Sequence, residues 1–193
     1  MNCELSASDR GSLLRLARAA IMDAVCGENL LAELLEGTGL SPGMRATRGV
    51  FVTLKHPDPG RPGGFELRGC IGKVLSLEPL YRTLLEVAPR AAQGDPRFPP
   101  VPPDELPAIR IGISALTPPT RLTGIDDLVI GRDGVRLVQG PRQAVFLPQV
   151  AEEQGWDRRR LLQQLAVKAG LAKQDWNGAE LSVFQTEQFA EPM

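Results

Sequence analysis

A guanidinium and a thiol lie two residues apart within the apolar stretch 65–74. If this stretch is an extended strand, alternate side chains share a face, so Arg68 and Cys70 point the same way. Gly69 and Gly72 flank them and leave bare backbone that another molecule can approach. A permanent cation beside a thiol favours the thiolate, which is the nucleophilic form of cysteine. We therefore expect this strand to mark a functional site.

One interpretation of the site is catalytic. Cys70 would act as a nucleophile or redox thiol, Arg68 would lower its pKa, and Asp95 would serve as the base. The alternative is that Cys70 is a small packed residue, because the sequence offers no obvious His partner and free cysteines are often buried. Both interpretations stay open at this point.

A second interpretation is recognition without catalysis. The candidate residues for contact with a phosphate, a carboxylate or a peptide are Arg68, Gly69, Gly72, Lys73, Arg97 and Gln149. The arginine fork binds planar oxyanions bidentately. Gln149 follows Pro148 at an expected strand end, where its amide can both donate and accept. The alternative is that Arg68 pairs with Asp95 or Glu66 and only ties a loop to the sheet.

The elements that position these residues follow from periodicity and turn residues. Strands are expected at 49–54 and 65–74, as a hairpin with a long loop. Helices are expected over 8–26, 29–36, 79–93 and 157–169, with a break or kink at Pro89 and one or two helical turns over 150–154. Further strands are expected over 109–116, 126–130, 135–138, 144–147 and 181–186. Because helices and strands do not alternate regularly, we predict an α+β fold with a largely antiparallel sheet flanked by helices.

Composition narrows the class of protein. Of the residues, 42% are hydrophobic and 23% charged, and the net charge is −1, so no strongly basic field favours nucleic acid, which stays possible only through a local groove. No apolar run approaches a membrane span, and the start lacks a secretory signal. Three scattered cysteines suit a reducing cytoplasm. The single His56 and the absence of a CxxC motif argue against a metal site.

Four motifs resemble one known family. Leu67-Arg68-Gly69-Cys70-Ile71-Gly72 is similar to the signature hexapeptide of the AMMECR-domain family, whose prokaryotic members are called protein A of the AmmeMemoRadiSam system. The other three motifs are 95–101, 147–151 with Glu153 and Gly155-Trp156, and 168–171 with Trp176, and the run 49–54 is similar to the family's strand before the signature. The chain departs from the family at Ala166, where a cysteine is frequent, and at Asp133, where a histidine is frequent.

The resemblance implies a single AMMECR-like domain over residues 1–193, with two unequal lobes and a groove between them. The larger lobe would include both termini and the smaller lobe would be inserted. The family's system name implies a radical S-adenosylmethionine enzyme and a Memo-type protein as partners, which would hold the cofactors, with none on this chain. We therefore expect a cytoplasmic binding or accessory component that uses a groove around the signature strand. The alternative is an enzyme that uses Cys70 to modify a macromolecule or a metabolite.

Overall fold

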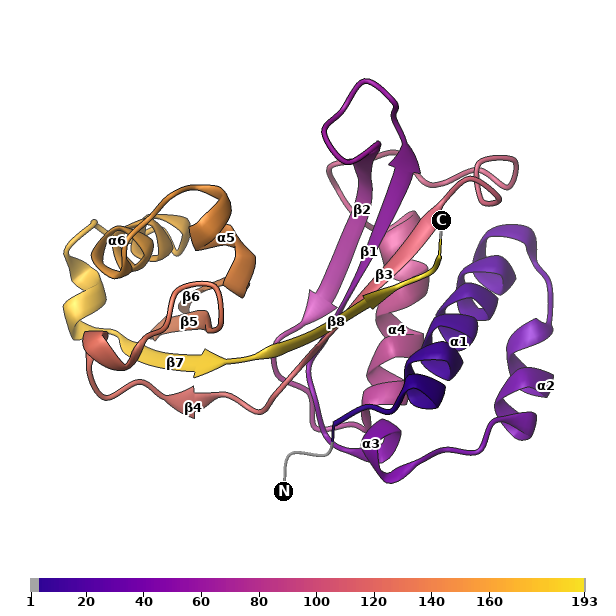
Figure 1. The fold of residues 1–193 in the computed structure, drawn as a ribbon, viewed down its shortest axis with the longest axis horizontal. Helices are drawn as coiled ribbons and strands as arrows, with labels where there is room; N and C mark the ends of the chain where they lie inside the picture. The colour runs from indigo at the N-terminus through magenta and orange to yellow at the C-terminus, as the bar shows by residue number, and fades with distance from the viewer. Residues whose placement is uncertain (1–3, 193) are drawn as a thin grey trace. The chain divides into compact units, whose positions relative to one another are not determined.

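The computed structural model describes residues 4–192. The chain forms two compact units, Met1–Ala115 with Glu187–Met193, and Leu116–Thr186. Each unit has its own hydrophobic core and its own four-stranded sheet (Figure 1). Helices and antiparallel strands occur in both, so the predicted α+β class is confirmed.

The first unit holds the signature strand. Its elements are α1 (Ala7–Cys26), α2 (Leu30–Gly37), α3 (Pro42–Arg45), β1 (Val50–Pro57), β2 (Phe65–Lys73), α4 (Leu80–Gln93), β3 (Arg110–Leu116) and most of β8 (Thr186–Ala190). The strand order is β2-β1-β3-β8, which leaves β2 at an edge. Helix α4 packs on β1 and β2, and α1 packs on α4 (Figure 1).

Local sequence explains where the first helix begins and ends. The Ser6 hydroxyl accepts from the backbone N–H of Asp9, and the Asp9 carboxylate accepts from the N–H of Ser6, which forms a capping box. Gly27 ends the helix with a φ of 72°, in the left-handed region that glycine adopts at little cost. The apolar stripe of α1, including Leu13, Leu16 and Ile21, is fully buried. The predicted helix at 8–26 is therefore confirmed.

The hairpin of β1 and β2 is antiparallel, as predicted, but its register is not regular. Leu54 pairs with Gly69, while the next residue, Lys55, pairs with Leu67. Arg68 is thus the extra residue of a β-bulge and has no partner on β1. A bulge interrupts the alternation of side chains. The expectation that Arg68 and Cys70 share a face assumes strict alternation, which the bulge interrupts at Arg68, so it stays a prediction.

Helix α4 continues through Pro89, so the expected break is absent, and the expected kink stays a prediction. Proline lacks the N–H that would bond to the carbonyl four residues earlier. The residues on both sides of it, including Val87, Ala88 and Ala91, are buried against the core. Because most helical stability in proteins comes from such packing, the loss of one hydrogen bond does not end the helix here.

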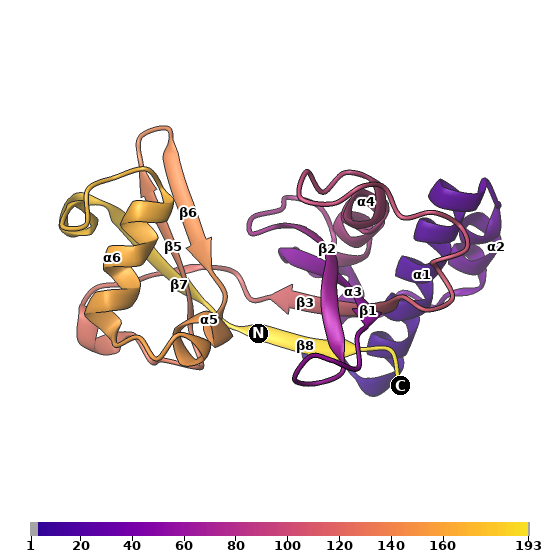
Figure 2. The ribbon, with the colours of Figure 1, turned by 90° about the horizontal axis from the view of Figure 1, so that it is seen from above.

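The second unit contains the remaining elements. These are β4 (Thr120–Arg121), a 3-10 turn η1 (Ile125–Asp127), β5 (Gly134–Gln139), β6 (Arg142–Phe146), α5 (Pro148–Glu153), α6 (Arg158–Lys168), a second 3-10 turn η2 (Asp175–Gly178) and β7 (Glu180–Phe184). The strand order is β4-β7-β5-β6, and α6 packs on β5 and β6 (Figure 2).

Two predictions about this part of the chain are wrong. The strand expected at 126–130 is absent, because η1 lies at its start and the Leu128 N–H donates to the Ile125 carbonyl of this turn. The Val129 N–H donates to the Asp133 carboxylate, and the Asp133 N–H donates to the Val129 carbonyl. The strand expected at 181–186 ends at Phe184, and a further strand, β8, joins the sheet of the first unit. Within residues 4–192, no helix is long and apolar enough to cross a lipid bilayer.

Candidate functional site

The free edge of β2 is occupied by two side chains. Asp95 Oδ2 accepts a hydrogen bond from the backbone N–H of Cys70 at 2.8 Å, and Arg97 Nη2 donates to the Cys70 carbonyl at 3.3 Å. Exposed strand edges present unpaired N–H and C=O groups to any other strand. At Cys70, the Asp95 and Arg97 side chains take the place of a neighbouring strand.

Asp95 and Arg97 also bind each other. Arg97 Nε lies 2.9 Å from Oδ1 and Nη2 lies 2.7 Å from Oδ2, a bidentate pair. The Asp95 side chain is 3% exposed and the Arg97 side chain 55%. The hydrogen bonds from the Arg97 guanidinium, together with the backbone N–H groups of Cys70 and Arg97, outweigh the effect of burial and hold the pKa of Asp95 well below its usual range. Asp95 therefore stays ionised at neutral pH.

Arg68 binds other groups of this chain. Its Nε and Nη2 lie 2.7 and 3.0 Å from the two carboxylate oxygens of Glu105, and its Nη1 and Nη2 donate to the carbonyls of Pro99 and Pro100. The side chains of Arg68 and Glu105 are only 13% and 19% exposed. Arg68 thus ties β2 to the proline-rich segment, with Glu105 in place of the expected partners Asp95 or Glu66.

The Cys70 thiol is free and half-buried. Its Sγ lies 3.3 Å from Thr53 Oγ1. Thr53 stands directly opposite Cys70 on the antiparallel strand β1, and side chains of such opposed residues lie close together. The guanidinium that contacts Cys70 is that of Arg97, through the carbonyl oxygen, whereas Arg68 turns to Glu105. Arg97 therefore reaches the backbone of Cys70, and the predicted effect of a cation on the thiol stays a prediction.

The two glycines of the motif allow the protein to pack against itself. A Cβ on Gly69 would collide with the carbonyl oxygen of Ala91 on α4, and a Cβ on Gly72 would collide with the ring of Phe51. We expected these positions to leave backbone open to another molecule. Instead, the space beside them is filled by the chain itself, so close internal approach explains why glycine stands there.

The remaining candidates lie further from the thiol or in the other unit. Lys73 Nζ is 2.6 Å from Glu86 Oε2 in an exposed ion pair. Gln149 belongs to α5 in the second unit and not to a strand end. Its participation in a site with Cys70 stays a prediction.

Sequence reasoning missed three residues that matter here or nearby. Glu105 and Thr53 contact Arg68 and Cys70 from 37 and 17 residues away. Arg48, which is buried, lies 2.6 Å from Glu187 of β8. No local pattern relates these partners, because they meet only when the sheet has formed. Buried charges need partners, which explains Glu105 beside Arg68 and Arg48 beside Glu187, while the neutral Thr53 hydroxyl contacts the Cys70 thiol.

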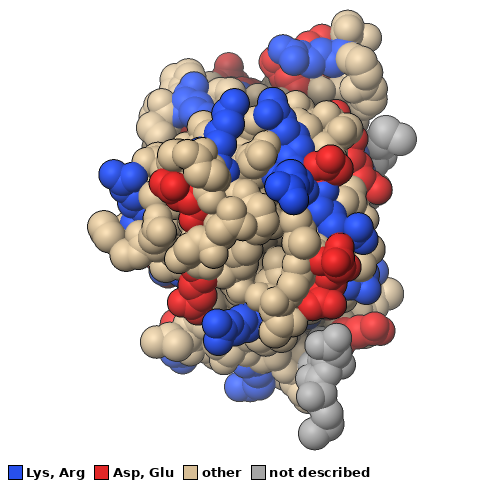
Figure 3. Space-filling model, turned by 90° about the vertical axis from the view of Figure 1, so that its left-hand side faces the viewer, with Lys and Arg blue, Asp and Glu red and all other residues tan. Residues whose placement is uncertain are grey.

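Two tryptophans of the matching motifs lie in the second unit. Trp156 and Trp176 pack against its core, and Trp156 meets Phe146 edge to face at 5.6 Å between ring centroids. The arginines of 158–160 are exposed at the start of α6. On the face of the molecule in Figure 3, basic side chains are most numerous in the upper half and are interspersed with acidic and uncharged ones. Over residues 4–192, no group of three His, Cys, Asp or Glu side chains is placed to hold a metal ion.

Comparison with known proteins gives one consistent result. The AMMECR1 family model matches residues 14–189. The chain is 38% identical to Protein MK0488 of Methanopyrus kandleri, over 99% of this chain and 92% of the relative. It is 39% identical to a protein of Thermococcus onnurineus, over 90% of this chain and 84% of the relative. The crystal structure of an uncharacterized protein, PH0010 from Pyrococcus horikoshii, is similar with a TM-score of 0.77 and 33% identity, over 93% of this chain and 89% of that one.

Proposed function

Because this chain belongs to the AMMECR1 family, we propose that it is a cytoplasmic binding or accessory protein that works with a radical S-adenosylmethionine enzyme and a Memo-type protein. The edge of β2 around Cys70 is its contact surface. The observation that carries this proposal is that the charged groups of the motif are already bound within the protein. Arg68, Asp95 and Arg97 fix the positions of the backbone at this edge, and these three groups are not arranged to transfer a proton.

Asp95 is poorly suited to act as a general base. A general base works best when its pKa lies near the operating pH. The pKa of Asp95 lies far below that, because Arg97 and two backbone N–H groups stabilise its ionised form. Its Oδ2 is also occupied by the Cys70 N–H and by Arg97 Nη2. A carboxylate in this state orients a strand edge better than it removes a proton from a thiol.

Arg97 is the residue through which a partner can be recognised. Its Nε and Nη2 are bound, but its Nη1 makes no hydrogen bond within residues 4–192, and more than half of the side chain is exposed. The guanidinium carbon lies 5.4 Å from the centroid of the Phe98 ring. An arginine supported by an aromatic ring and a buried carboxylate has a restricted orientation, so it loses little freedom when it binds a partner's carboxylate.

The test is direct binding to the two expected partners. The purified radical enzyme and Memo-type protein of the same organism are titrated with the wild-type chain and with Arg97→Ala, in a calorimeter. We expect binding to at least one partner, weakened about tenfold or more by Arg97→Ala. Arg82→Ala is the matched control, because Arg82 is also exposed and also paired with a carboxylate, at Glu78.

The binding of each Arg97 variant is compared with its free energy of unfolding. Arg97→Lys keeps a positive charge beside Asp95 and separates loss of recognition from loss of folding. If neither partner binds the folded wild-type chain, or if Arg97→Ala and Arg82→Ala bind equally well, the proposed surface is wrong.

A second candidate function is catalysis by Cys70, as nucleophile or redox thiol on a macromolecule or metabolite. One observation favours it: the thiol is free and only half-buried, with a hydroxyl at 3.3 Å. The rate of alkylation by iodoacetamide in the native protein separates the two functions, with exposed Cys26 as the internal reference. A Cys70 that reacts faster than Cys26, in Cys26→Ser and Cys70→Ser variants compared side by side, supports catalysis. A slower Cys70 supports the binding role.

A further inference from the structure

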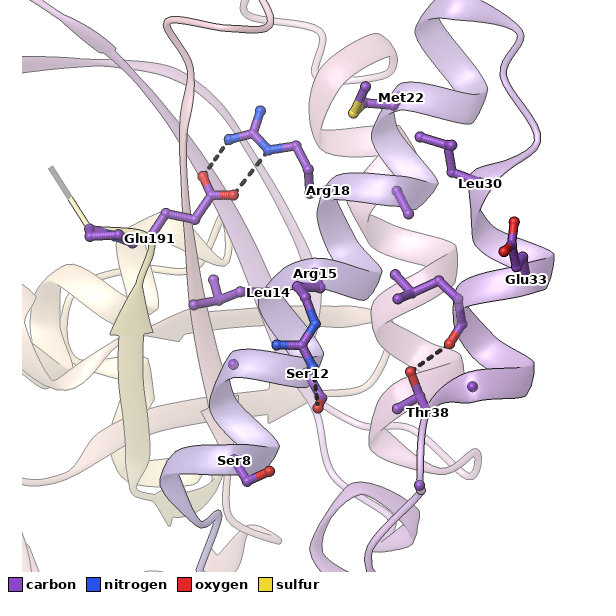
Figure 4. Close-up of a pocket in the computed structure, with 16 residues that line it drawn as sticks. Ser8, Ser12, Leu14, Arg15, Arg18, Met22, Leu30, Glu33, Thr38 and Glu191 are labelled. Carbon is purple, nitrogen blue, oxygen red and sulfur yellow. Dashed lines mark hydrogen bonds and ion pairs between the residues drawn. The ribbon is translucent and has the colours of Figure 1, made fainter.

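A groove of about 920 Å³ lies along α1 and α2, away from the motif residues of β2 (Figure 4). Its lining is mainly apolar, and its apolar residues include Leu14, Ala19, Met22, Leu30 and Leu34. Met22 and Leu30 lie at one end in Figure 4, and Ser12, Arg15 and Thr38 lie towards the other. The volume is within the range of small-molecule sites, about 300–1,000 Å³.

The groove exists because α2 covers α1 only in part. None of the eight residues of α2 is buried, although four of them are leucines, and Leu30 is 42% exposed. The helix is nevertheless held in place at its start, where the Asp23 carboxylate accepts from the N–H groups of Leu30 and Leu31 at 2.8 and 3.0 Å. At its end, the Thr38 hydroxyl donates to the Leu34 carbonyl. Both ends of α2 are thus fixed by hydrogen bonds that do not depend on a ligand in the groove.

Two arginines one turn apart on α1 line this groove with different partners. Arg18 is bound by both carboxylate oxygens of Glu191 and donates to two backbone carbonyls. Arg15 is exposed and donates to the Ser12 hydroxyl at 3.0 Å, but over residues 4–192 it forms no ion pair. Because Glu33, the other acidic residue of the lining, points away from Arg15 in Figure 4, the positive charge of Arg15 is not neutralised from α2.

We propose that this groove binds a small amphipathic carboxylate, an acyl chain that ends in a carboxylate group. The acyl chain lies against Ala19, Met22 and Leu30, and the carboxylate accepts hydrogen bonds from Arg15. From Arg15 to Met22 along α1 the distance is about 10 Å, which suits a medium-length chain. The carboxylate of the ligand pairs with the Arg15 guanidinium as the Glu191 carboxylate pairs with that of Arg18. This binding site is independent of the surface on β2.

Met22 makes the test specific. The chain has four methionines, of which Met22 lines the groove and Met44 is completely buried in the core. In protein labelled with carbon-13 at the methionine methyl groups, decanoate is added below the concentration at which it forms micelles. We expect the Met22 signal to shift with saturation and the Met44 signal to stay in place. Decanol, which has the same chain without charge, should bind about tenfold more weakly.

Two variants separate the parts of the site. Arg15→Ala should weaken decanoate about tenfold and leave decanol unchanged, whereas Leu30→Asp should weaken both. Arg61→Ala, in the exposed hairpin loop, is the control that should change neither. An unmoved Met22 signal overturns the proposal, and so does equal binding of decanoate by wild type and Arg15→Ala. Binding of an acidic amphipathic helical peptide without binding of decanoate would make the groove a protein-docking site and also overturn it.

Discussion

The edge of β2 and the groove between α1 and α2 use arginine in opposite ways. At the edge of β2, Arg68 and Arg97 are each bound bidentately by a carboxylate of the same unit, and Gly69 and Gly72 of β2 are in close contact with backbone or ring atoms. In the groove, the partner of Arg15 is a hydroxyl, and among residues 4–192 no non-neighbouring atom lies within 4 Å of a Cβ placed on Gly37 or Gly39. The difference teaches that residues of a conspicuous motif can serve mainly to hold a surface in shape, while ordinary residues line an open site.

The sharpest way to test this contrast is to add one methyl group in each region. Gly69→Ala should lower the free energy of unfolding by about 3 kcal/mol or more, because the new Cβ collides with the Ala91 carbonyl and neither backbone can move freely. Gly39→Ala should change it by no more than about 0.5 kcal/mol, because the space there is open. Urea denaturation followed by circular dichroism measures both. Equal effects would contradict the contrast.

Removing the buried carboxylate of β2 should have the next largest effect. Asp95→Ala leaves the Cys70 N–H without its acceptor and Arg97 without its partner, so we expect a loss of about 2–3 kcal/mol. Asp95→Asn keeps an acceptor oxygen and should lose less. The measurement is the same denaturation, and a loss below about 0.5 kcal/mol in Asp95→Ala would mean that the edge does not need the Asp95–Arg97 pair.

Truncating one arginine in each region compares them directly. Arg68→Ala should cost about 1–2 kcal/mol, because it leaves the part-buried Glu105 carboxylate unpaired. Arg15→Ala should stay within about 0.5 kcal/mol, since Arg15 is exposed and makes no ion pair in the described part of the chain. A double-mutant cycle of Arg68→Ala with Glu105→Gln isolates the coupling between the two side chains. A coupling energy of zero would contradict the structural role assigned to Arg68.

The smallest expected effect is on the pH dependence of stability. The pKa of Asp95 is lower in the folded chain than in the unfolded one, so its contribution is complete above about pH 5 and is lost as the pH falls towards the folded pKa. With an unfolded pKa of about 3.9, the loss from Asp95 alone is about 0.3 kcal/mol at pH 4 and grows below that. Asp9, Asp133 and Glu187 also have lowered pKa values. The difference between wild type and Asp95→Asn across pH 3–7 therefore isolates Asp95, and parallel curves would contradict the prediction.

Local signals in the sequence predicted much of the fold. The helix predicted over 8–26 is α1 and ends at Gly27, the helix predicted over 157–169 is α6 and is capped by Asp157, and the alternating run 109–116 forms β3. These predictions succeeded because caps and periodicity act within a few residues. The wrong ones depended on distant contacts: the break expected at Pro89 is absent because α4 packs on the sheet, and residues 186–190 form a separate strand beside β3.

For the candidate site, the sequence by itself determined which residues gather: the thiol of Cys70, two arginines, Asp95 and the glycines between them. It also determined that the chain belongs to a family, since four motifs recur in order. Only the tertiary structure decided how they pair. Arg68, the extra residue of a bulge, pairs with Glu105, whereas Arg97 binds the Cys70 carbonyl, and the groove beside Arg15 forms where α2 leaves part of α1 uncovered. The physical reason is that charge pairing and close packing depend on distances in space, which residue type and spacing along the chain do not define.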